Sequence, residues 1–116
     1  ITKDIDNQEL EILKNYTIKY NNIFLYSDYL DKNENSFQDS ISIIKNCDGL
    51  ITTDTAIPHL SLNLDIKTYI MLTVGCDYRW SINDNYTNWY PEAILIRQEK
   101  YNDWNSVINK LNKLIN

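Results

Sequence analysis

The sequence predicts an α/β fold built on a parallel sheet with helices on both faces, and three features indicate it. Short apolar runs at 50–53, 68–72 and 93–96 have the length and composition of buried strands. Stretches with helical spacing of apolar residues alternate with these runs. Right-handed crossovers between such strands make them parallel and place the intervening helices on the two faces of the sheet.

The first third of the chain predicts a helix, a strand and a second helix. Apolar residues at helical spacing predict a helix over 6–20, and the run Ile23–Tyr26 predicts a short buried strand. Polar residues over 31–36 predict a loop, after which Ser36 can cap a helix that continues to Cys47. With this strand included, the predicted sheet has about four strands.

From Ile23 to Leu72 the predicted elements follow the order β-α-β-α-β, and the rest of the chain adds a last strand and a closing helix. A long segment over 76–92 has no regular pattern and is rich in aromatic residues, so we expect it to pack over the domain. Asn102-Asp103 offers the N-cap of the last helix. The predicted elements are a strand over 50–53, a helix over 56–64, strands over 68–72 and 93–96, and an amphipathic helix over 104–115.

Length and charge restrict the class of protein. A chain of 116 residues predicts one domain, residues 1–116. Its net charge of −5 argues against broad attraction to nucleic acid or anionic lipid, so a bound phosphate would have to be held locally. Cys47 and Cys76 are isolated, which predicts two reduced thiols and no metal site. No apolar run approaches the roughly 20 residues that span a bilayer, and we expect a cytoplasmic protein.

The junction between the strand 50–53 and the following helix is the first candidate for a binding site. In a parallel sheet it lies at the carboxyl edge, where free N–H groups and the helix dipole can hold a phosphate or diphosphate. The amides of Thr55, Ala56 and Ile57 are the donors that a first helical turn leaves unpaired. Asp54 or Thr55 can cap the helix. His59 could stabilise a leaving diphosphate, or it could be an ordinary core or capping histidine.

Several blocks of the sequence resemble one family. They are 48–60 with Asp54-Thr55 and His59-Leu60, then Tyr78-Arg79-Trp80, Trp89-Tyr90-Pro91, Arg97-Gln98 and Asp103-Trp104. In this order they resemble bacterial glycosyltransferases of the lipopolysaccharide heptosyltransferase type, most closely the carboxyl-terminal region of members that follow tetratricopeptide repeats. The resemblance covers the last two thirds of the chain strongly and the first third weakly.

The resemblance implies a GT-B architecture, in which two Rossmann-like domains face each other across a cleft. This chain would be an incomplete carboxyl-terminal domain that binds a nucleotide-diphosphate sugar through Asp54, Thr55, Ala56 and His59. Lys3 would match a basic residue that also approaches phosphate. The acceptor, a glycan or a protein, and the general base would belong to a missing amino-terminal domain. Such enzymes need no metal and no cofactor beyond the donor.

The chain departs from the family after His59-Leu60, where both expected glycines and a proline are replaced. Leu62 is bulkier than the family residue, which leaves open a noncatalytic Rossmann-like interaction module in which the donor pocket has decayed. A phospho-receiver is a weaker alternative, because no acidic cluster with a matched Thr and Lys follows the strands. Asp4-Ile5-Asp6 has the metal-binding spacing of another transferase class, but its place at a helix start favours capping.

The segment 76–92 holds further candidates with two interpretations each. Arg79 could bind phosphate or pair with a carboxylate of the same loop, and the pairing is the commoner role. Trp80, Trp89 and Tyr90 could stack on a base or sugar, although aromatic residues of a covering loop more often pack against the core. Ile1-Thr2-Lys3 resembles the end of a strand, so we expect the chain to be a fragment of a longer protein.

Overall fold

The computed structural model describes residues 6–26, 30, 37–82 and 85–116. These residues fall into two compact units, 1–40 and 41–116. Lys3, Asp4 and Ser36, which the sequence singled out, lie outside the described residues. The prediction that 1–116 forms one domain stays a prediction.

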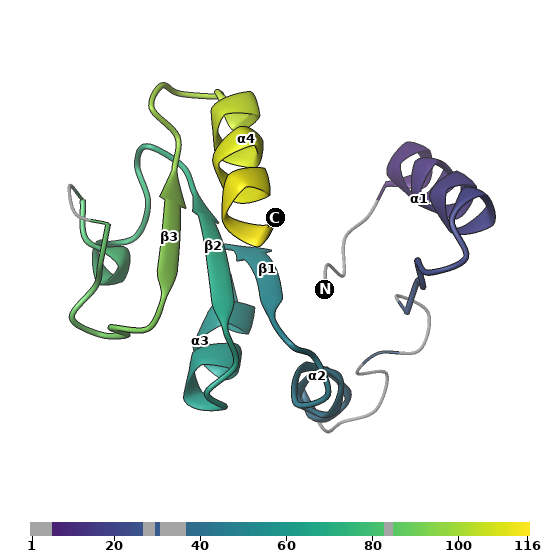
Figure 1. The fold of residues 1–116 in the computed structure, drawn as a ribbon, viewed down its shortest axis with the longest axis horizontal. Helices are drawn as coiled ribbons and strands as arrows, with labels where there is room; N and C mark the ends of the chain where they lie inside the picture. Colours follow the sequence, from purple (N-terminus) through teal and green to yellow (C-terminus); the bar gives the residue numbers. More distant parts are fainter. Residues whose placement is uncertain (1–5, 27–29, 31–36, 83–84) are drawn as a thin grey trace. The chain divides into compact units, whose positions relative to one another are not determined.

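The first unit contains α1, Asn7–Lys19, as the sequence predicts (Figure 1). Asp6 is its N-cap, and a capping box joins the two ends of the first turn: Glu9 N donates to Asp6 Oδ1 at 2.8 Å, and Asp6 N donates to Glu9 Oε2 at 3.4 Å. The Asp6 carboxylate is therefore used for capping, in agreement with the capping interpretation of Asp4-Ile5-Asp6.

The prediction of a strand at Ile23–Tyr26 is wrong, because these residues adopt no regular structure. Their apolar side chains are largely in solvent, with Phe24 71% exposed. A strand is stable only when a neighbour pairs with its backbone and covers its apolar face. No strand within the described residues pairs with this segment, so its β propensity alone does not make it a strand.

The second helix, α2, covers Gln38–Ile44 and is shorter than the predicted one. The predicted extension to Cys47 is wrong, since Asn46 N and Cys47 N donate to the carbonyls of Ile43 and Ile44 three residues back. Such bonds close a tight final turn and end the helix. Gly49 then leads into the sheet.

The second unit is built on a three-stranded parallel sheet in the order β1-β2-β3, formed by Leu50–Thr53, Thr68–Leu72 and Ile94–Arg97. Leu50 lies opposite Thr68, and Tyr69 lies opposite Ile94. The strand arrows run in the same direction in Figure 1. The predicted α/β class is confirmed, whereas the predicted fourth strand is missing because 23–26 does not join the sheet.

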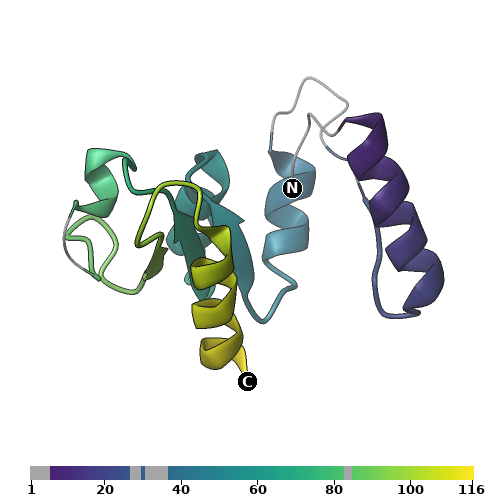
Figure 2. The same cartoon turned by 90° about the horizontal axis from the view of Figure 1, so that it is seen from above.

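Helices cover both faces of this sheet, as predicted. The helix α3, Ala56–Asn63, contacts β1 and β2, and α4, Trp104–Ile115, contacts β3. Figure 2 shows α4 in front of the sheet and α3 behind it. Strand side chains alternate between the faces, so one cluster gathers on the α3 side and the other under α4. The first contains Ile70, Leu72, Trp80, Ala93 and Leu95, and the second Tyr69, Ile96, Val107 and Leu111.

Local signals account for both helices. Thr55 caps α3, and Asp103 caps α4 by accepting from Ser106 N at 3.1 Å. Between β2 and β3 runs the predicted irregular segment, which contains one short 3₁₀ helix, η1, Tyr78–Trp80. Among the helices of the described residues, none is both long and apolar enough to cross a bilayer.

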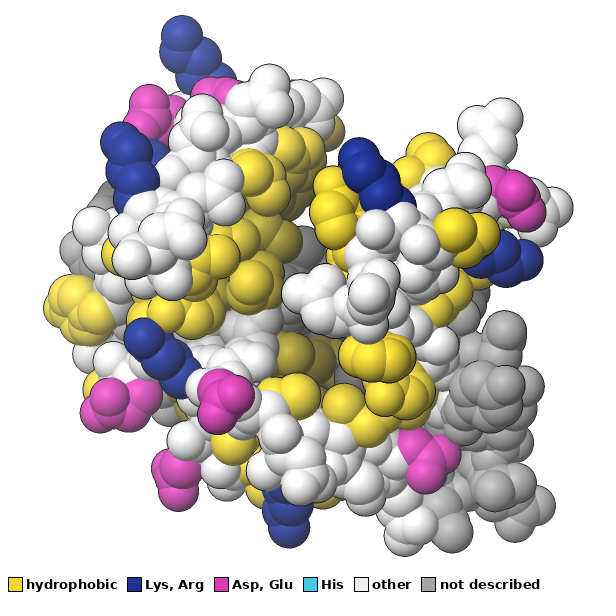
Figure 3. Space-filling model, turned by 45° about the vertical axis from the view of Figure 1, so that its right-hand side comes forward, with side chains coloured by type: hydrophobic (Ala, Val, Ile, Leu, Met, Phe, Trp, Pro, Cys, Tyr) yellow, Lys and Arg dark blue, Asp and Glu magenta, His cyan; other side chains and the backbone are white. Residues whose placement is uncertain are grey.

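Apolar side chains also remain on the surface of each unit (Figure 3). In the second unit Ile51 is 47% exposed and Leu114 52% exposed. Scattered exposed apolar residues are normal for a small fold, so these carry no functional argument by themselves.

A buried pair of hydroxyl groups joins α3 to β2. Ser61 Oγ lies 2.5 Å from Thr68 Oγ1, and both residues are fully buried. Thr68 Oγ1 donates to the Ile66 carbonyl at 2.7 Å, so Ser61 is the donor to Thr68.

We predict that Thr68→Val, which keeps the shape of the side chain, lowers the free energy of unfolding by about 1–3 kcal/mol, because Ser61 and Ile66 lose a buried partner. Urea unfolding measures this loss. The double variant Ser61→Ala/Thr68→Val should recover part of it, since no hydroxyl is then left unpaired at residue 61. Equal losses in the single and double variants would contradict the prediction.

Candidate functional site

The candidate site begins at the turn between β1 and α3, at the carboxyl edge of the sheet. β1 ends at Thr53 and α3 begins at Ala56, so only two residues connect them. Thr55 has extended backbone angles, φ −136° and ψ −171°, and its Oγ1 accepts from Ile57 N at 3.3 Å. Of the two predicted capping residues, the structure therefore selects Thr55.

The capping bond leaves two backbone donors without a partner at this helix end. No hydrogen bond from Thr55 N or Ala56 N is formed within the described residues. Pro58 has no N–H, and the side chains of Thr55 and Ala56 are exposed. Unpaired amides at a helix N-terminus, combined with the positive end of the helix dipole, attract anions.

Asp54 does not cap α3 but connects its N-terminus to η1. Its Oδ1 accepts from Trp80 Nε1 at 2.6 Å, and its Oδ2 accepts from Asp77 N at 3.2 Å. Trp80 is fully buried, and a buried indole N–H needs an acceptor. The carboxylate thus meets that requirement and fixes η1 beside the β1–α3 turn.

His59 lies in a cluster of aromatic rings. Its Nδ1 is 3.0 Å from the Tyr90 hydroxyl, and its ring stacks on Trp80 with centroids 4.9 Å apart. Trp80 and Tyr90 also stack, at 5.9 Å. Of the aromatic candidates, these two are packing residues, whereas Trp89 is 60% exposed. Nε2 is the nitrogen of His59 that Tyr90 leaves for another partner.

Burial lowers the pKa of His59 from its ordinary value, and the positive charge of Arg79 lowers it further. The carboxylates of Asp54 and Asp77 oppose this shift by favouring the charged ring. The net direction is downward, so the folded protein favours the neutral imidazole.

Arg79 forms the ion pair that the commoner interpretation predicted. Its Nε donates to Asp77 Oδ1 at 2.8 Å, and its Nη2 donates to Asp77 Oδ2 at 3.2 Å. These hydrogen bonds lower the pKa of the Asp77 carboxyl and raise that of Arg79. The Arg79 side chain is still 40% exposed. Arg79 could therefore bind phosphate only while it also keeps its ion pair with Asp77.

Arg97 fastens the same segment from the end of β3. Its Nη1 donates to Cys76 Sγ at 2.8 Å, and its Nη2 donates to the Trp80 carbonyl. The carboxyl edge therefore carries two carboxylates, Asp54 and Asp77, and two guanidinium groups, Arg79 and Arg97. Their charges balance, so the acidic chain presents no net negative charge here to a bound phosphate.

Gln98 follows Arg97 and is 6% exposed, with no partner for Oε1 or Nε2 within the described residues. Its backbone N donates to the Leu72 carbonyl at 3.0 Å, which extends the pairing of β3 by one residue. Strand alternation places its side chain on the face opposite that of Arg97. It therefore belongs to the α4 side and not to the group around His59.

The structure thus brings together Asp54, Thr55, Ala56, His59 and Arg79, whereas Lys3 lies outside the described residues. The sequence analysis missed Asp77, which caps η1 by accepting from Arg79 N at 2.9 Å. An Asp two residues before Arg at the start of a turn is a capping signal that could have found it. Within the described residues, no three His, Cys, Asp or Glu side chains lie close enough to hold a metal ion.

In comparisons with known proteins, no family model, no curated protein and no solved structure matches this chain.

We predict that Asp54→Ala lowers the free energy of unfolding by about 1–3 kcal/mol, because the buried N–H of Trp80 loses its acceptor. Urea unfolding measures the change. Asp48→Ala, at an exposed position, is the matched control and should change stability by less than about 0.5 kcal/mol. Trp80→Phe added to Asp54→Ala should cost less than the two separate losses combined, and simple additivity would contradict the assigned bond.

The lowered pKa of His59 predicts a pH dependence of stability. Since the unfolded chain binds a proton more readily, the contribution of His59 is complete above about pH 6.5 and is lost as the pH falls toward the folded-state pKa. His59 is the only histidine, so its NMR titration is unambiguous. We expect a midpoint below about 6.5. His59→Gln should flatten the decrease in stability between about pH 7.5 and about pH 5.5; a midpoint at or above the ordinary value would refute the assignment.

Proposed function

We propose that this chain is the donor-binding part of a glycosyltransferase of the GT-B class, related to the heptosyltransferase type. The N-terminus of α3 binds the diphosphate of a nucleotide sugar. The sugar is then transferred to a glycan or protein acceptor. The other half of the enzyme, which would supply the acceptor site and the general base, is a separate amino-terminal domain of the same protein.

The observation that supports this proposal most is the pair of unpaired amides at the start of α3. Thr55 N and Ala56 N have no partner within the described residues, and both residues are exposed. The turn lies at the carboxyl edge of a parallel sheet, where ligands of open α/β folds bind. Hydrogen bonds from these backbone amides would become stronger as negative charge develops on the departing diphosphate. The amides are already in position, so no reorganisation is needed to stabilise that charge.

The side chains around these amides have separate roles in the proposal. Asp54 positions the turn through Trp80 and Asp77 and does not contact phosphate, since its oxygens are already accepting hydrogen bonds. Nε2 of His59 donates to a phosphate oxygen while Nδ1 holds Tyr90. Arg79, which is paired with Asp77, adds positive charge near the site. Lys3 enters through the family resemblance alone. No metal and no further cofactor are required by this arrangement.

A second candidate function is a noncatalytic interaction module with the same fold. It is favoured by the fully buried Trp80 ring, which stacks on His59, and by Leu62, which packs against the same apolar cluster. The Trp80 ring occupies space beside the N-terminal turn of α3, and Leu62 stands where the family resemblance implies a smaller residue. The two candidates differ in one measurable property, which is binding of a nucleoside diphosphate.

Calorimetric titration with ADP, GDP and UDP and with their sugars tests the proposal. At least one should bind to the folded chain, with the diphosphate supplying most of the affinity. The absence of binding to all of them by a sample shown to be folded would favour the noncatalytic module.

We predict that Ala56→Pro weakens nucleoside diphosphate binding about tenfold, because it removes one amide that hydrogen-bonds to phosphate. Proline is well tolerated at the first position of a helix, and the extended backbone of Thr55 is compatible with a following proline. Ala56→Ser keeps the amide and is the matched control. Unchanged affinity in a folded Ala56→Pro variant would remove the amides from the proposed site.

A further inference from the structure

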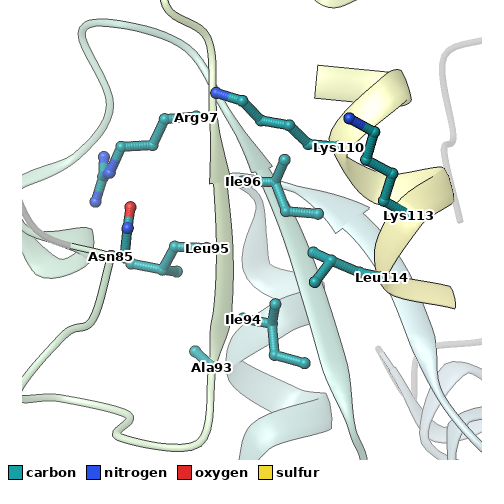
Figure 4. A pocket seen from close by; sticks show the side chains of 9 residues that line it. All are labelled: Asn85, Ala93, Ile94, Leu95, Ile96, Arg97, Lys110, Lys113 and Leu114. Carbon is teal, nitrogen blue, oxygen red and sulfur yellow. The ribbon is translucent and has the colours of Figure 1, made fainter. Parts of the chain in front are cut away.

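A cavity of about 570 Å³ runs along β3, and its lining does not include His59, Trp80 or Tyr90. Its lining includes the five consecutive residues Ala93–Arg97. Successive side chains of a strand point to opposite faces, so a single cavity can touch all five only along the free edge of the strand. Asn85 borders this groove on one side, and Lys110, Lys113 and Leu114 of α4 border it on the other (Figure 4).

The edge of β3 is available for backbone pairing. β3 is the last strand in the order β1-β2-β3, so within the second unit no described strand pairs with its outer side. A terminal strand presents alternate N–H and C=O groups outward, and these can pair with an extended segment of another chain. Neither a proline nor an acidic residue interrupts Ile94–Arg97.

The charge of the groove restricts its occupant. Lys110 and Lys113 extend from α4 beside β3, and no Asp or Glu is among the lining residues. Lys110 is paired with Glu99 at 2.8 Å, but both side chains are largely exposed, and such a pair is easily exchanged for another carboxylate. Two copies of this chain paired through β3 would bring their own lysines together, which disfavours self-association.

The apolar lining supplies the other half of the recognition. On the α4 side Leu114 is 52% exposed and Ile94 is half-buried, and on the opposite face the lining includes Ala93 and Leu95. A strand that pairs with β3 would direct one set of alternate side chains toward α4, where acidic residues would meet the lysine amino groups. The other set would lie on the opposite face, where apolar residues would meet Ala93 and Leu95.

From these contacts we propose that the β3 groove binds an extended segment of a partner protein by strand addition, and that this segment alternates apolar and acidic residues. The backbone of β3 supplies the hydrogen bonds, while Lys110 and Lys113 select acidic over basic partners. This binding surface shares Arg97 with the carboxyl edge but contains none of the residues proposed to bind the diphosphate, and the proposal does not depend on that site.

Fluorescence anisotropy with short labelled peptides tests the proposal on the full chain. A peptide that alternates valine and glutamate should bind, and added salt should weaken it. The matched peptide that alternates valine and lysine should not bind. Equal binding of both peptides, or binding of neither, would overturn the proposal.

Two further arms separate strand addition from simple attraction between charges. Lys110→Glu/Lys113→Glu should weaken the acidic peptide about tenfold, whereas Lys100→Glu, at an exposed position outside the groove, should leave its affinity unchanged. The acidic peptide N-methylated at alternate amides keeps its charge but cannot form the ladder. It should lose binding to the unmodified chain, and full retention would exclude strand addition even if the lysine variant failed to fold.

Discussion

Two hydrogen bonds accepted by the Asp54 carboxylate hold the candidate site together. One comes from the indole of Trp80 and the other from the backbone of Asp77, so a single side chain in the β1–α3 turn fixes the segment that follows β2. Further contacts hold the same segment in place. Asp77 caps η1 and pairs with Arg79, and Arg97 contacts Cys76 and the Trp80 carbonyl. Asp54 accepts from two N–H donors, Asp77 and Arg79 pair with each other, and Arg97 donates to two acceptors, which lowers the cost of partly burying the last three.

The same bonds have two consequences for function that oppose each other. They remove Asp54 from the capping position, so that Thr55 caps α3 and two amides stay free for an anion. They also draw Trp80 into the core beside His59, where its ring occupies space next to those amides. An anion such as a diphosphate needs only the open helix end, whereas a whole nucleotide sugar needs room as well. The free amides therefore support the transferase, and the buried ring supports the noncatalytic module.

His59 belongs to the helix that begins with the free amides, and it contacts the buried Trp80 ring. Its ring is stacked on Trp80 and hydrogen-bonded through Nδ1 to Tyr90, and burial lowers its pKa despite two nearby carboxylates. A neutral imidazole can donate a hydrogen bond without adding charge, so in the proposed site the attraction for phosphate would come mainly from the helix end and from Arg79. The β3 groove shares Arg97 with this edge but has its own lysines, so a partner and a nucleotide would be bound mainly by different residues of the same unit.

Local pattern by itself determined the strands at 50–53 and 68–72, the helices that begin at Ala56 and Trp104, and the parallel α/β class, because apolar periodicity and capping residues act over a few neighbours. It also located the N-terminus of α3 at Thr55 and predicted an anion site there. Only the tertiary structure decided that Ile23–Tyr26 is not a strand, since pairing needs a distant partner. In the same way, a contact between residues 26 positions apart assigned Asp54 to Trp80, and tertiary packing buried Trp80 while it left Trp89 exposed. Such contacts depend on how the sheet brings the ends of its strands together, which no local sequence pattern encodes.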